Sequence, residues 1–73
     1  MRIRKICEKI INDFNKLYEE PKAIKISDLS ATLKQEYNLN NKTTENCIKY
    51  LKEYGYIAYD PVRDLSHAYW IKQ

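Results

Sequence analysis

Few side chains in this 73-residue sequence could carry covalent or metal chemistry, and they do not form a motif. The chain has one histidine, His67, two cysteines, Cys7 and Cys47, and one glycine. Phosphate-binding loops need several glycines, and zinc sites need histidines and cysteines at close, regular spacing. We therefore expect no enzyme activity, no metal and no cofactor. No small-molecule ligand is evident, and His67 is expected on the surface.

A second group of side chains, within residues 41–50, has the chemistry that binds DNA. Asn46 can pair with adenine through two hydrogen bonds, and Glu45 can accept one from cytosine. Lys42, Thr43 and Lys49 can hold phosphates or guanine edges. The alternative is an ordinary solvent-exposed helix face. The predicted DNA-binding residues are Asn41, Lys42, Thr43, Glu45, Asn46, Lys49, Tyr50 and Arg63.

The composition indicates one small globular domain, residues 1–73. Hydrophobic residues make up 44% and charged residues 32% of the chain, which is too apolar for a disordered segment. The formal net charge of +3 is spread evenly along the sequence, so charge alone favours a polyanionic partner only weakly. Since no apolar run reaches the length of a membrane span, we expect a cytoplasmic protein without a membrane partner.

Apolar side chains recur every three or four residues in three segments, which predicts three helices. These helices cover residues 3–20, about 28–36 and about 42–54. Pro21 ends the first helix, and Ser27 is expected to cap the start of the second. Asparagines in residues 38–41 predict a turn between the second and third helices, and Gly55 suits a left-handed residue after the third.

Outside the helices the period changes to two, which predicts strands. Residues 23–26 alternate over four positions and predict a very short strand. Residues 56–59 and 66–71 are rich in β-prone side chains and flank residues 60–65. The C-terminal part of the chain is therefore predicted to be a β-hairpin with a six-residue loop.

Residues 43–57 combine a helix with the start of a hairpin in a recurrent pattern. Cys47 stands at a small position, Ile48 and Leu51 form an apolar pair, and Gly-Tyr-Ile leads into the hairpin. This segment, within the order helix, strand, two helices, hairpin, resembles the winged helix-turn-helix superfamily. Thr44 departs from the pattern, which usually has Val or Ile there. The size and composition are similar to those of small archaeal, viral or plasmid regulators.

The resemblance implies an α+β fold of three helices, with a C-terminal hairpin wing and a very short strand before the second helix. It implies a transcriptional regulator that binds preferred double-stranded DNA sequences as a homodimer, in the host cytoplasm if viral. The third helix would lie in the major groove and the wing on the backbone or in the minor groove. Arg63 would then enter a minor groove, or instead pair with Asp60 or Asp64. A winged-helix adaptor that binds protein and not DNA is the alternative.

Two pairs of residues leave structural alternatives open. Tyr69 and Trp70 point to opposite sides of the last strand. Either Tyr69 faces the helices and Trp70 is exposed as a partner surface, or Trp70 is in the core. Cys7 and Cys47 lie on the buried sides of the first and third helices. They are either two free core thiols or a disulfide between these helices.

Overall fold

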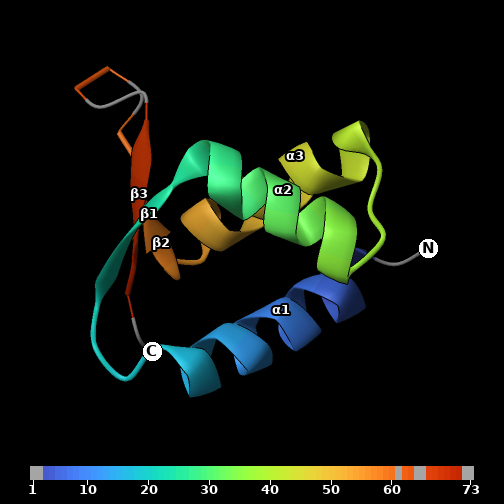
Figure 1. Ribbon diagram of the computed structural model, residues 1–73, viewed down its shortest axis with the longest axis horizontal. Helices are drawn as coiled ribbons and strands as arrows, with labels where there is room; N and C mark the ends of the chain where they lie inside the picture. Colours follow the sequence, from blue (N-terminus) through green and yellow to red (C-terminus); the bar gives the residue numbers. More distant parts are fainter. Residues whose placement is uncertain (1–2, 61, 64–65, 72–73) are drawn as a thin grey trace.

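The computed structural model describes residues 3–60, 62–63 and 66–71 of the chain. Within them the fold is α+β, with three helices on one side of a three-stranded antiparallel sheet (Figure 1). The element order is α1 (Ile3–Leu17), β1 (Lys22–Lys25), α2 (Ile26–Glu36), α3 (Asn41–Glu53), β2 (Ile57–Ala58) and β3 (His67–Trp70). The predicted α+β class and the predicted order of elements are therefore confirmed.

The central strand of the sheet is β3. It pairs antiparallel with β1 on one side and with β2 on the other, which gives the strand order β1-β3-β2. Trp70 lies opposite both Lys22 and Ile57 in this register. The predicted hairpin and the predicted strand before α2 thus belong to one sheet. Figure 1 shows that residues 62–63, in the connection between β2 and β3, lie beyond the end of the sheet and away from the helices.

Trp70 lies in the core, so the alternative that exposes it is wrong. Its side chain is fully buried, whereas the side chain of Tyr69 is 50% exposed. The indole Nε1 donates a hydrogen bond to Asn15 Oδ1 of α1 at 3.0 Å, and the ring lies 5.1 Å from that of Phe14. The large ring of Trp70 fills the core beside the helices, and Asn15 satisfies its buried N–H group. The core consists of Cys7, Ile10, Phe14, Leu29, Leu33, Leu39, Cys47, Leu51, Ile57, Ala68 and Trp70.

The start of α2 differs from the prediction. The helix begins at Ile26, directly after β1, and the side chain at the cap position, Lys25, makes no capping bond. Ile26 N–H donates to the carbonyl oxygen of Ser66 at 2.7 Å. This contact with the segment before β3 is made only in the folded chain, and α2 begins before Ser27. Ser27 as the N-cap is therefore wrong.

The other helix ends follow local signals more closely. α1 ends at Leu17, before the predicted limit at Pro21. Asn38, in the turn between α2 and α3, has φ 56°, and Gly55, after α3, has φ 79°. Asparagine and glycine tolerate this left-handed conformation, so both turn predictions are confirmed.

The two cysteines are free thiols that face each other inside the molecule. Cys7 on α1 and Cys47 on α3 are fully buried, and their side chains are hydrogen-bonded. Burial is the largest cause that raises the pKa of Cys7, to about 12, and burial also raises the pKa of Cys47. In this arrangement they are core side chains and not nucleophiles. None of the helices in the described part of the chain is long and apolar enough to cross a bilayer.

Candidate nucleic-acid interface

The orientation of α3 is set by its cap and by its buried side. Asn40 caps the helix, since its Oδ1 accepts from the N–H of Thr43 at 2.8 Å. Thr44 is 2% exposed, and its hydroxyl donates to the carbonyl oxygen of Asn40 at 2.8 Å. Thr44, Cys47 and Leu51 are the buried residues of the helix. The polar Thr44 is therefore accommodated where the resemblance expects an apolar residue, and the opposite side of α3 is turned to solvent.

Most of the predicted DNA-binding residues lie on this outer side. Lys42, Glu45, Asn46 and Lys49 are exposed, as is Asn41 in the first turn. None of the five takes part in an ion pair among the described residues. Their polar groups are therefore available to a ligand.

A hollow of about 380 Å³ lies between the outer side of α3 and the end of β2. Its lining consists of Lys42, Glu45, Asn46, Ile48, Lys49, Lys52 and Tyr59. The hollow places three ammonium groups and one side-chain amide around the same space. Glu45 is the acidic side chain in this lining, so the hollow carries a net positive charge. Such a surface attracts a polyanion.

The sequence prediction missed two residues that line the hollow, one charged and one aromatic. Lys52 places its Nζ 5.7 Å from the centre of the Tyr59 ring, which is cation–π distance. Lys52 could have been found from helix spacing, because it follows Lys49 by three residues on the same face. Tyr59 could not, because it lies just after β2 and only tertiary packing brings it to α3. Ile48, the predicted apolar partner of Leu51, is half-buried and lines the hollow.

Three predicted residues of α3 lie outside this hollow: Asn41, which is exposed in the first turn, Thr43 and Tyr50. Thr43 is half-buried, and its backbone N–H is engaged by the cap. Tyr50 packs against the core, with its ring 4.4 Å from that of Tyr54. Desolvation and the neighbouring Tyr54 raise the pKa of Tyr50, and its charged neighbours, Arg4 and Glu8, belong to α1. The structure therefore places Tyr50 on the α1 side of α3.

Arg63 lies in the connection between β2 and β3, as predicted, but it does not join the α3 hollow. Its Nε is 3.7 Å from Asp60 Oδ2, and its side chain is 88% exposed. Asp60 Oδ1 also accepts from the N–H groups of Val62 and Arg63, which forms a local turn. Asp64, the other predicted partner, lies outside the described residues. An ion pair this exposed contributes little, so the guanidinium can leave Asp60 for a phosphate.

A separate hollow of about 430 Å³ lies at the base of the hairpin. Arg63, Tyr59, Tyr69 and His67 contribute to its lining. His67 is half-buried, with Nδ1 2.7 Å from the hydroxyl of Ser66, and was predicted to be a surface residue. Tyr59 lines both hollows and so separates the arginine of the hairpin from the lysines of α3.

Comparison with known proteins does not assign a function to this surface. No protein-family model, curated protein sequence or solved structure matches the chain. The candidate interface is therefore defined by the geometry of α3 and of the hairpin.

Proposed function

We propose that this chain is a winged helix-turn-helix protein that binds double-stranded DNA with sequence preference and regulates transcription. α3 would lie in the major groove, and the β2–β3 hairpin on the backbone or in the minor groove. The observation that carries the proposal is the outer side of α3, where Asn46 and three lysines without an ion pair among the described residues surround one hollow. A helix of 13 residues is about 20 Å long, and an α-helix fits the major groove.

The arrangement of the neighbouring elements supports this docking. α2 precedes α3 through a short turn and packs against it, while α1 packs on α3 and leaves its outer side uncovered. The hairpin strands follow α3, and residues 62–63 between them lie away from the helices (Figure 1). This element order supports the winged-helix assignment.

The charges on α3 favour selective binding over uniform binding. Lys42, Lys49 and Lys52 can each hold a phosphate, which gives affinity without sequence information. Asn46 can read adenine, and Glu45 repels phosphates but can accept a hydrogen bond from cytosine. The same surface therefore combines general attraction with two residues that distinguish bases.

A homodimer remains a prediction, and the residue that motivated it is not at the surface. Trp70 is buried, whereas Tyr69 and Ile71 are exposed, by 50% and 36%. Tyr69 lies opposite Ala23 and Ala58 on the neighbouring strands. In a dimer, this outer side of the sheet is the apolar surface that we expect to be covered.

The proposal is tested by the salt dependence of binding to genomic duplex fragments, measured by fluorescence anisotropy. Each phosphate contact contributes about −0.9 to the slope of log affinity against log salt concentration. Lys49→Ala should reduce the magnitude of that slope by about 1 and weaken all duplexes alike. Lys5→Ala is the matched control, because Lys5 is exposed on α1, away from the α3 hollow.

Two results would contradict the proposal. One is the absence of any binding to duplex DNA at low salt, and the other is an equal effect of the two lysine substitutions. The first result would favour the adaptor alternative, in which the same fold binds a protein.

A further inference from the structure

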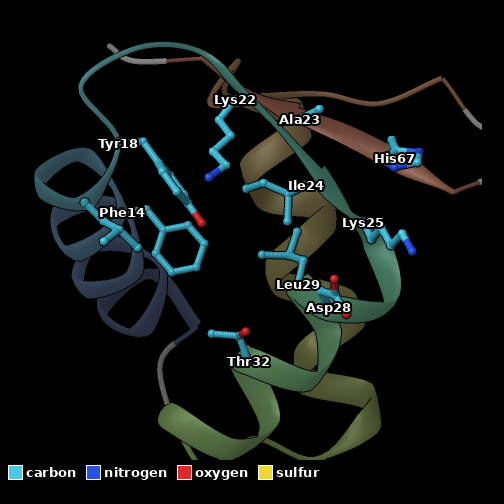
Figure 2. Close-up of a pocket in the computed structure, with 11 residues that line it drawn as sticks. Phe14, Tyr18, Lys22, Ala23, Ile24, Lys25, Asp28, Leu29, Thr32 and His67 are labelled. Carbon is cyan, nitrogen blue, oxygen red and sulfur yellow. The ribbon is translucent and has the colours of Figure 1, made fainter.

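A further cavity, of about 430 Å³, lies between α1, β1 and α2. It forms because α1 ends at Leu17 and the chain then turns to run along the sheet edge as β1. Figure 2 shows the side chains that face it from three elements. They are Phe14 from the last turn of α1, Tyr18 directly after that helix, Lys22 and Ile24 from β1, and Leu29 and Thr32 from α2.

The wall of the cavity is mostly apolar. Phe14 and Leu29 are 6% and 1% exposed, so they form a buried apolar floor. Ile24 and Tyr18 are half-buried and pack against the same core. A cavity of this size is within the range of small-ligand sites, which combine apolar walls with a few polar groups.

Lys22 contributes to the cavity an ammonium group that has no carboxylate partner among the described residues. Figure 2 shows the Lys22 side chain extending from β1 toward Tyr18, and its Nζ lies 5.5 Å from the centre of that ring. A ring face holds an ammonium more weakly than a carboxylate does, because it supplies no charge-assisted hydrogen bond. The hydroxyls of Tyr18 and Thr32 are further donors near this space.

The other charged side chains of the lining leave the cavity positive. Lys25 belongs to the lining, but Figure 2 shows its side chain directed away from the apolar floor. Asp28 is the acidic residue of the lining and is exposed in the first turn of α2. Figure 2 shows it beyond Leu29, on the side away from Tyr18. Lys22 is therefore the charged group nearest to the aromatic floor.

We propose that this cavity binds a small hydrophobic carboxylate, with one aromatic or branched aliphatic body and one acid group. The body lies on Phe14, Ile24 and Leu29, and the carboxylate pairs with Lys22. A phosphate ester fits less well, because only the Lys22 ammonium and two hydroxyls lie near the apolar floor, whereas the ester has three terminal oxygens that share up to two negative charges. A neutral or cationic ligand of the same shape leaves Lys22 unpaired or repelled.

The walls of the site are held in place before a ligand enters. The hydrogen bond from Trp70 to Asn15 ties the last turns of α1 to β3, and Phe14 contacts the same tryptophan. Such preorganisation lowers the cost of binding. The cavity shares no lining residue with the α3 hollow and shares His67 with the hollow at the base of the hairpin, so its occupancy is tested in the absence of DNA.

The test is a titration of the full chain with 3-phenylpropionate, followed by amide chemical shifts in ¹H–¹⁵N NMR spectra. 3-Phenylpropanamide has the same body without the charge and serves as the ligand control. We expect saturable shifts at Tyr18, Lys22, Ile24 and Leu29 with the carboxylate, and affinity weaker by about tenfold or more with the amide. Equal affinity for acid and amide, or shifts elsewhere on the chain only, would overturn the proposal.

A substitution gives a second, independent readout. Lys22→Met keeps the length of the side chain and removes its charge, and it should weaken 3-phenylpropionate by about tenfold or more while leaving the amide unchanged. Lys34→Met, at an exposed position near the end of α2 outside the cavity lining, is the matched control. If the two variants bind the acid equally well, Lys22 does not hold the carboxylate. Binding of acid and amide to unaltered protein decides the matter even if Lys22→Met fails to fold.

Discussion

Removal of the acceptor for the buried indole N–H of Trp70 should destabilise the protein measurably. Trp70 is fully buried, and its Nε1 donates to Asn15 Oδ1 at 3.0 Å. In Asn15→Ala the donor stays in the core without a partner, because alanine has no polar side-chain atom. An unsatisfied buried donor costs about 1–3 kcal/mol.

The expected effect is large for a chain of this size. A domain of 73 residues has a free energy of unfolding of about 4–11 kcal/mol. In a domain of this length, each kcal/mol changes Tm by about 4–8 °C, so Asn15→Ala should lower Tm by at least about 4 °C. Urea unfolding followed by tryptophan fluorescence should give a lower midpoint with an unchanged slope.

Asn12→Ala is the matched control for this substitution. Asn12 lies three residues earlier on the same helix and is exposed, so the change in side chain and in helix propensity is the same. We expect its free energy of unfolding to stay within about 0.5 kcal/mol of the original. If Asn12→Ala and Asn15→Ala have equal stability, the hydrogen bond is absent and the inward orientation of Trp70 is wrong.

Three further predictions concern DNA binding and the core thiols. Asn46→Ala should cost about 1–3 kcal/mol on a duplex selected from a random pool and much less on an unselected duplex, and equal losses would exclude base readout. Arg63→Ala should weaken sites flanked by A-tracts more than sites flanked by G·C pairs in gel-shift assays, whereas no loss would show that the guanidinium stays with Asp60. The pKa of Cys7 is raised to about 12, so the folded state retains a proton that the unfolded state loses above about pH 9. Stability in urea should therefore fall between about pH 9 and pH 12, and Cys7→Ala should reduce this dependence relative to the unaltered chain.

Much of the fold could be predicted because the spacing of apolar side chains along the sequence indicates each helix and strand. Apolar side chains of α1 and α3 recur at helical intervals, and Asn38 and Gly55 mark the turns that follow α2 and α3. The exposed side of α3 follows from the same spacing, which is why Lys42, Asn46 and Lys49 were found. These features depend on backbone geometry within one element, so a single sequence is sufficient to predict them.

The remaining features of the fold depend on contacts between distant segments. Residues 69 and 70 are both large and aromatic, and a period of two cannot tell which side of β3 faces the helices. Packing against Phe14 and the hydrogen bond to Asn15 place Trp70 on the side of β3 that faces the helices. The same kind of long-range contact, from Ile26 to the carbonyl of Ser66, moved the start of α2.

The two candidate sites also depend partly on local spacing and partly on contacts between distant segments. Helix spacing alone determines that Lys49 and Asn46 share an exposed face of α3. Only the folded chain brings Tyr59, just after β2, to Lys52 of α3, and only the turn after α1 places Lys22 of β1 against the ring of Tyr18. A sequence determines which side chains share a face of one element, whereas a cavity needs faces of several elements, whose relative positions are set by the packing of the whole core.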